Sequence, residues 1–211
     1  MVIKLWDGFI RSFHWLLVLA IAGLWYTGGN IDYIDLHHRL GVFVLALILT
    51  RILWGIFGSE SGRFSRFVRS PKAVVYYLKA PFASTWLTHN PIGGWAVILM
   101  LAALLAQAVS GLFTDDAIFF RGPLAHLVSQ DWVRTLTSFH KQLFDWILVL
   151  LALHILANIV YAVRGKNLIT PMITGNLKTE KNDLTPPKQV HPGFGFILFA
   201  INVTVLFWWL T

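Results

Sequence analysis

The chain has no cysteine and few charged residues. None of its 211 residues is Cys and only 13% are charged, against about 25% in an average soluble domain. The lack of Cys excludes disulfides, thiolate metal sites, iron–sulfur clusters and covalently attached haem of the C-x-x-C-H kind. Because 56% of the residues are hydrophobic, the scarcity of charge argues against a soluble globule, a disordered chain or a repeat solenoid.

The hydrophobic residues gather in five runs of about the length that crosses a bilayer, roughly 17–25 residues each. These runs cover residues 12–27, 37–57, 93–113, 138–162 and 193–211. Each is predicted to be helical, because lipid offers no hydrogen-bond partners to the backbone. We therefore predict an all-α integral membrane protein. Residues 1–175 would form a four-helix transmembrane domain, 176–192 a linker and 193–211 a fifth transmembrane helix.

The basic residues indicate how the chain is oriented. Of 17 Lys and Arg, thirteen fall on one side of the predicted spans: Lys4, Arg11, Arg51, Arg63, Arg66, Arg69, Lys72, Lys79, Arg164, Lys166, Lys178, Lys181 and Lys188. The positive-inside rule then places the N-terminus in the cytoplasm and the C-terminus outside. This accounts for the net charge of +7 without a nucleic-acid partner. A cleaved signal peptide over residues 1–27 is an alternative, although His14 and the aromatic-rich end of the segment fit a retained helix better.

Two loops carry further signals. Ser70-Pro71 is a cap and first-turn pair, and it predicts a short helix lying on the inner membrane surface. The outer segment 114–137 is expected to contain a short helix near 123–128. With Asp115, Asp116 and Asp131, this outer segment is a candidate docking surface for an external partner.

Histidines within the apolar runs are the strongest functional candidates, because ionisable groups at membrane depth are unfavourable. His140 and His154 are fourteen residues apart, so they project from one helix face at levels about 21 Å apart. His37 opens the second run on the outer side and His14 lies near the inner end of the first. The depths pair His37 with His140 outside, and His14 with His154 inside.

Facing imidazoles at two levels of a helical bundle suit two b-type haems. With both axial positions filled by His, electron transfer is favoured over oxygen chemistry. Zinc binding and proton relay remain competing interpretations. A single membrane His is also more often an interhelical hydrogen-bond partner than a ligand.

Residues near His37 fit this interpretation. Gly41 lies one turn away, where the missing side chain would let a macrocycle approach. Arg51 shares that face at the inner depth, where it would either pair with haem propionates or snorkel to the interface. His38 competes with His37 but is offset by about 100°. The remaining histidines, in loops, are expected at the surface: His89, His126 and His191.

Several segments together resemble the bacterial cytochrome b561 family, which includes the cytochrome b subunits of nickel–iron hydrogenases. The resemblance covers residues 5–175 and leaves the fifth run outside. The matching segments are 11–15 (RSFHW), 37–41 (HHRLG), 89–95 (HNPIGGW), 107–113, 138–140 (SFH) with His154, and 171–175 (PMITG).

The resemblance implies two b haems bound by His14, His37, His140 and His154, with Arg11 also among the cofactor-binding residues. It implies electron exchange between quinone and a periplasmic c-type cytochrome or hydrogenase, in the bacterial inner membrane. Whether the subunit is itself a quinol oxidoreductase, or a homodimer in the lipid, stays open. The alternatives are a histidine-dependent proton or metal transporter and a non-catalytic membrane anchor of a redox complex.

Overall fold

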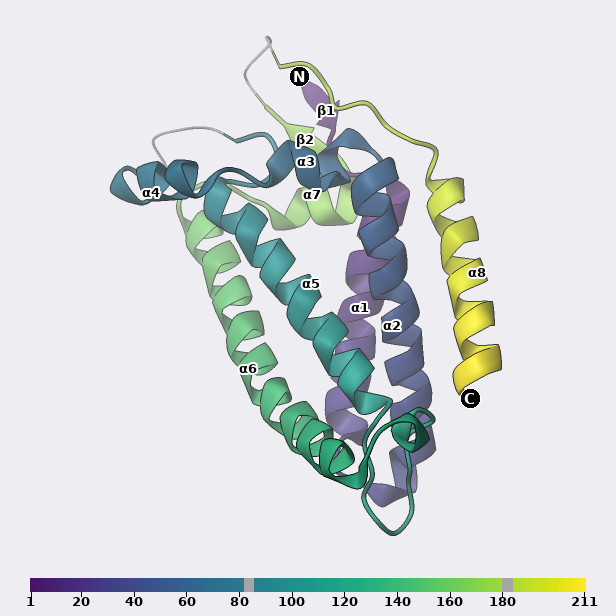
Figure 1. Ribbon diagram of the computed structural model, residues 1–211. Helices are drawn as coiled ribbons and strands as arrows, with labels where there is room; N and C mark the ends of the chain where they lie inside the picture. The colour runs from purple at the N-terminus through teal and green to yellow at the C-terminus, as the bar shows by residue number, and fades with distance from the viewer. Residues whose placement is uncertain (82–85, 180–183) are drawn as a thin grey trace.

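Five long helices dominate the protein (Figure 1). The computed structural model describes residues 1–81, 86–179 and 184–211; Lys181, counted above for orientation, lies outside these ranges. The five helices are α1 (Gly8–Thr27), α2 (Ile34–Phe57), α5 (Pro91–Gly111), α6 (Gln130–Val163) and α8 (Pro192–Leu210). All five are long and apolar enough to cross a membrane. The all-α membrane prediction is confirmed.

The helices begin earlier than the hydrophobic runs because their polar caps lie outside the apolar stretch. The Asp7 carboxylate accepts the Ile10 N–H at the start of α1. Asn90 accepts the Gly93 N–H, and Pro91 fills the first turn of α5. The largest difference is in α6, which begins at Gln130 rather than at residue 138. Its 34 residues span about 51 Å at 1.5 Å per residue, more than the hydrocarbon core of a bilayer.

One end of the bundle, here called the sheet end, carries most of the small elements (Figure 1). Strands β1 (Val2–Lys4) and β2 (Asn176–Lys178) pair antiparallel there, beside α3 (Phe64–Phe67), α4 (Pro71–Lys79) and α7 (Ile169–Thr174). The predicted short helix at Ser70-Pro71 is confirmed as α4. The sheet was not predicted, because three-residue strands show no alternation in the sequence.

The opposite, loop end holds the connection from α5 to α6. The short helix expected near 123–128 is present as a 3-10 helix at Ala125–Leu127. The Asp116 carboxylate shapes the preceding loop by accepting the N–H groups of Ile118, Phe119 and Phe120. Three charge-assisted bonds to one carboxylate oxygen hold this loop in a tight turn.

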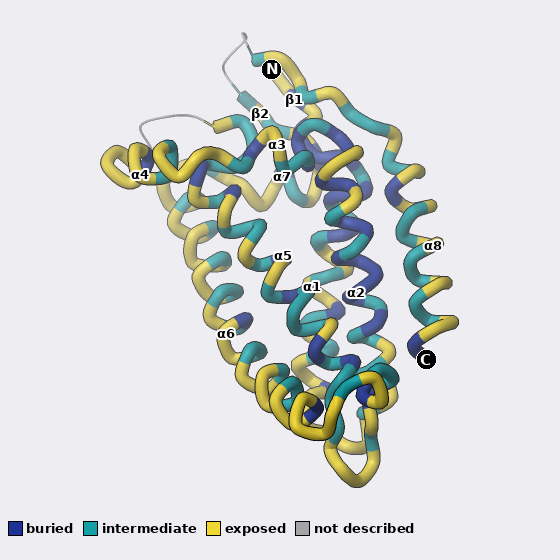
Figure 2. The backbone as a smooth tube through the Cα atoms, in the orientation of Figure 1, coloured by how far each residue is buried: buried dark blue, intermediate teal, exposed yellow. Residues whose placement is uncertain are grey.

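Helix α2 is the most enclosed of the five long helices, and much of its tube is dark blue in Figure 2. α1 and α5 pack on it, and α8 covers its remaining side. Asn202 of α8 donates to the Thr50 hydroxyl, and His38 lies 2.8 Å from the Leu210 carbonyl. α8 is therefore docked on α2 by polar contacts as well as by apolar packing.

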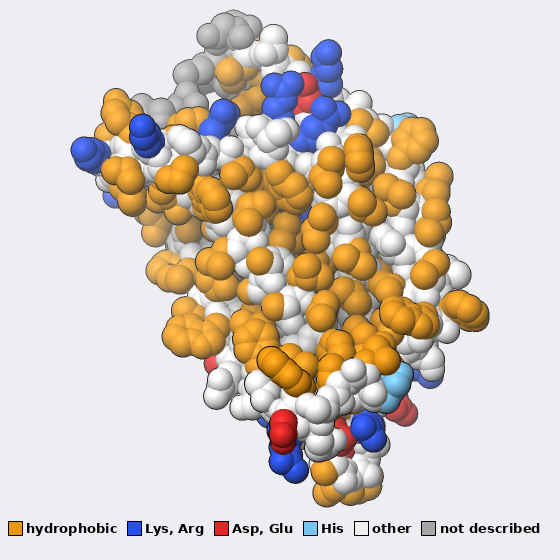
Figure 3. Space-filling model, viewed as in Figure 1, with side chains coloured by type: hydrophobic (Ala, Val, Ile, Leu, Met, Phe, Trp, Pro, Cys, Tyr) orange, Lys and Arg blue, Asp and Glu red, His pale blue; other side chains and the backbone are white. Residues whose placement is uncertain are grey.

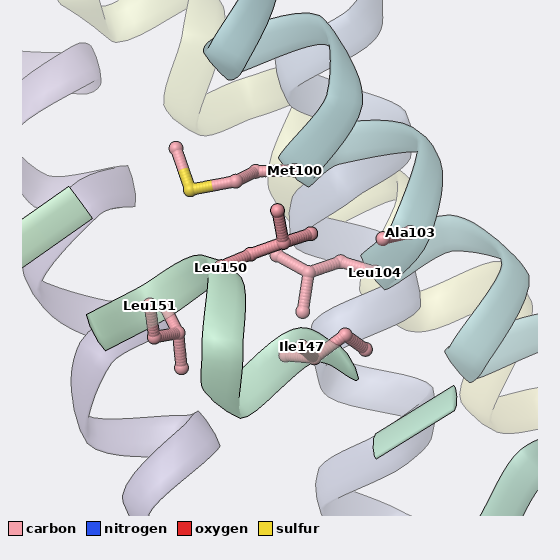
Figure 4. A pocket seen from close by; sticks show the side chains of 6 residues that line it. All are labelled: Met100, Ala103, Leu104, Ile147, Leu150 and Leu151. Carbon is pink, nitrogen blue, oxygen red and sulfur yellow. The ribbon is translucent and has the colours of Figure 1, made fainter. Parts of the chain in front are cut away.

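The sides of the bundle are apolar and the ends are charged (Figure 3). Exposed hydrophobic side chains cover α6 and α8, as expected for surfaces that face lipid. Between α5 and α6 a void of about 10 Å³ is lined only by apolar side chains (Figure 4): Met100, Ala103, Leu104, Ile147, Leu150 and Leu151. The contact between α5 and α6 is thus apolar on both helices.

Candidate functional site

The core histidines meet in two pairs, each between two helices. His14 of α1 faces His154 of α6 with ring centroids 6.5 Å apart and ring planes inclined by 47°. His37 of α2 faces His140 of α6, also with centroids 6.5 Å apart, at 84°. We call these the inner pair and the outer pair, after the sidedness predicted from the sequence. The structure brings together the partners that helical spacing predicted.

The outer pair, from α2 and α6, is held by hydrogen bonds to α1 and α5. The Thr27 hydroxyl donates to the Gly23 carbonyl, so its oxygen is left to accept from His37 Nδ1 at 3.1 Å. His140 Nδ1 lies 2.9 Å from the Gln107 carbonyl. Ligand histidines commonly donate one ring N–H to such acceptors, which leaves the other nitrogen for a metal. Here that nitrogen is Nε2, which in His140 lies 3.3 Å from the Gln107 amide nitrogen.

The inner pair has fewer polar contacts. His14 Nδ1 is buried without a hydrogen-bond partner among the described residues, and the Trp15 indole packs edge-on against the ring at 4.9 Å. His154 Nε2 lies 3.4 Å from the Asn158 amide nitrogen, which donates to the His154 carbonyl. The inner rings are therefore oriented mainly by packing.

Both pairs fit a metal held between two imidazoles. Imidazole nitrogens bind first-row metals such as zinc at about 2.0–2.1 Å, so two rings on opposite sides of one ion have centroids roughly 6 Å apart. At Gly41 an added Cβ would meet no heavy atom within 4 Å, which is the open space expected where a flat macrocycle approaches. Within the described ranges, no three His, Cys, Asp or Glu side chains converge. Among the described residues, the two imidazole pairs are side chains of a metal-binding type that face each other.

The two arginines expected near the cofactor lie at the sheet end. Arg51 is only 5% exposed, because its Nη2 donates to the Gly62 carbonyl and its guanidinium lies over the Phe64 ring. The side chain is thus enclosed by the loop after α2 and does not extend into solvent. Arg11 donates from Nη1 to the Ile173 carbonyl of α7. Arg51 Nη1 and Arg11 Nε are both buried without partners among the described residues.

One of the three loop histidines does not lie at the surface position expected for it. His89 packs between Trp6 and Phe67, with ring centroids 5.4 and 4.6 Å away, and is half-buried instead of exposed. Burial, with smaller contributions from Arg51 and His154, lowers the pKa of His89 to about 4. Its position before the α5 cap gave no sign of burial, because the rings that enclose it come from distant parts of the chain. His126 and His191 are exposed as expected, and His191 caps α8.

The acidic residues of segment 114–137 are occupied within that segment. Asp116 binds three backbone N–H groups, which lower its pKa, while Asp115 pairs with Arg121 and Asp131 with Arg134. A cleft of about 400 Å³ separates the loop from the start of α6. Docking to this end therefore cannot rely on free carboxylates alone.

A bundle of membrane-spanning helices that presents imidazole pairs at two levels is the architecture of a membrane-embedded cytochrome. The family model for prokaryotic cytochrome b561 matches residues 5–175, and the chain belongs to this family. No curated protein and no solved structure matches it. Membership means that the protein binds b-type haem and transfers electrons across a membrane. Helix α8 lies beyond the matched region.

Proposed function

We propose that this protein conducts electrons between the quinone pool and a periplasmic redox partner through two bis-histidine b haems. The observation that carries the proposal is the pair of facing imidazoles, with centroids 6.5 Å apart, at each of two levels along α6. Both levels belong to residues 1–175, which we expect to hold the haems without help from α8.

In this proposal helices α1, α2 and α6 supply the four axial histidines. Haem b, when bound, supplies a one-electron iron couple. His14 and His154 hold the inner iron, and His37 and His140 the outer one. Imidazole on both sides leaves no open coordination position, which favours electron transfer over ligand binding. Ile48, Leu104 and Ile147 lie in one buried apolar cluster at the centre of the bundle, where they exclude water between the two levels.

The proposed orientation places the sheet end in the cytoplasm and the loop end in the periplasm of a bacterial inner membrane. The distribution of Lys and Arg supports it through the positive-inside rule. The loop end then faces a c-type cytochrome or hydrogenase. Its tip offers Ile118 and Phe119, 78% and 63% exposed, as apolar contacts beside the ion pairs of the same loop.

The test uses the purified protein in lipid vesicles with a trapped, membrane-impermeant electron acceptor. A reduced quinone added outside should reduce the protein and then the acceptor. His140→Ala and His154→Ala should each stop transfer to the acceptor, while His38→Ala should not. Transfer that survives either ligand variant would contradict the proposal.

The visible spectrum separates the alternatives. A proton or metal transporter should show no b-type absorption bands, and none should be lost on His→Ala substitution. A passive membrane anchor should keep the activity of its complex when all four histidines are replaced.

A further inference from the structure

Four buried side-chain nitrogens have no hydrogen-bond partner among the described residues, and all four lie toward the sheet end. They are Arg11 Nε, His14 Nδ1, Arg51 Nη1 and His89 Nδ1. His14 belongs to the inner pair, but the other three come from α1, α2 and the loop before α5. A buried N–H without an acceptor is unfavourable, so these three groups at one end of the bundle point to an acceptor other than the described residues.

Each of these three side chains is held in place by contacts with the protein, while one of its nitrogens has no hydrogen-bond partner among the described residues. Arg51 is held by the Gly62 carbonyl and the Phe64 ring, and Arg11 by the Ile173 carbonyl. His89 is clamped between Trp6 and Phe67. Such fixation aligns a donor in advance, so that little ordering is needed when an acceptor binds.

The shared chemistry of the three groups is hydrogen-bond donation, with two positive charges among them. Contacting rings connect His89 to Arg51, because His89 packs on Phe67, Phe67 on Phe64, and the Arg51 guanidinium lies over the Phe64 ring. Arg11 precedes His14 of the inner pair by three residues on α1, so these two side chains share a helix face. Burial lowers the pKa of His89, so the imidazole is neutral and offers one N–H and no charge. Two guanidiniums and one neutral donor suit an anion with more than one oxygen, such as a carboxylate.

We propose that His89 is a positioning residue that donates from Nδ1 to a propionate carboxylate of the inner haem, together with Arg51 and Arg11. This inference rests on the proposed haem between His14 and His154. His89 would act on the charge of the propionate, and through it on the inner iron, without ligating the metal.

The experiment uses full-length protein carrying His37→Ala, which should retain only the inner haem. His89→Phe keeps the ring packing between Trp6 and Phe67 but removes the donor, whereas His89→Asn places an amide N–H near the Nδ1 position. An unscreened propionate stabilises ferric iron, so His89→Phe should lower the midpoint potential of the inner haem. We expect a change of up to tenfold in the reduction equilibrium, about 59 mV for one electron. The potential should also become more dependent on pH.

His89→Asn should restore most of the original potential, and the matched control His126→Phe, at an exposed loop position, should not change it. An unchanged potential and pH profile in His89→Phe would overturn the inference. If His89→Phe loses the inner haem, His89→Asn decides: retention at near-normal potential supports donation, and equal loss overturns it. If the His37→Ala protein itself holds no haem or two, the proposed function fails instead.

Discussion

The outer and inner histidine pairs have the same ring separation but different surroundings. The outer imidazoles contact Thr27 and the Gln107 carbonyl, whereas His14 Nδ1 has no partner among the described residues and lies toward the arginine-rich sheet end. Acceptors on a ligand N–H raise its basicity and favour ferric iron, while nearby cations favour ferrous iron. An equal ring separation therefore does not imply equal midpoint potentials. We expect the inner haem to have the higher midpoint potential.

Removing one imidazole should have the largest effect, because it should empty one haem level and leave the other filled. His154→Ala should abolish the inner haem and leave the outer one, and His140→Ala should do the reverse, because each ring serves one level. The haem-to-protein ratio and the reduced spectrum of each purified variant measure this. His38→Ala, whose ring contacts Leu210 on α8, is the matched control and should keep both haems. Loss of both haems from a folded single variant would contradict the pairing.

Filling the space at Gly41 should affect the outer level alone. An added Cβ at Gly41 meets no heavy atom within 4 Å, so Gly41→Leu should leave the fold of the chain intact. It should nevertheless displace the outer haem if the macrocycle occupies that space. Haem content, with circular dichroism as the check on folding, measures the effect. A Gly41→Leu protein that keeps both haems would show that the macrocycle lies elsewhere.

Removing an acceptor should change the outer haem without expelling it. Thr27→Val deletes the hydroxyl that contacts His37 Nδ1, so the outer potential should rise, and outer haem affinity should fall by about tenfold or more. Redox titration checks both levels. Thr50→Val is the matched control, because the hydrogen bonds of the Thr50 hydroxyl are with Asn202 of α8 and the Ala46 carbonyl. Neither residue is one of the four proposed haem-ligating histidines. A shift of the inner haem's midpoint potential in Thr27→Val would contradict the claim that Thr27 acts on the outer haem alone.

The smallest expected effect concerns the loop end alone. Backbone N–H groups lower the pKa of Asp116, so its stabilisation of the loop is present above about pH 4, the ordinary Asp range. That stabilisation is lost as pH falls through the lowered pKa of the folded protein. Asp116→Asn should therefore speed amide exchange at residues 118–120 severalfold at neutral pH and leave both haem spectra unchanged. Equal exchange in the two proteins would contradict this role.

Helical periodicity made the two histidine pairs predictable. The fourteen-residue spacing of His140 and His154 fixes their face and separation on one helix, and the depths of His14 and His37 then select partners. His37 was preferred over His38 because of its relation to Gly41 and Arg51. The structure shows His37 facing His140 and His38 contacting α8. Such inferences work because membrane helices are regular and few arrangements satisfy the backbone.

What the sequence did not predict depends on contacts between distant segments. His89 is enclosed by Trp6 and Phe67, and the β1–β2 sheet joins residues more than 170 positions apart. Neither leaves a local pattern. The role of Asp116 was also missed, because an acidic loop looks alike whether its carboxylates face solvent or bind the backbone.

The most direct test of the central claim is the haem content of the intact purified protein, compared with that of His154→Ala. Two equivalents of b haem per chain, titrating at two potentials, and one equivalent at the lower potential in the variant are the predicted results. A single equivalent in the intact protein, or an unchanged content in the variant, would contradict an account with two histidine-bound levels.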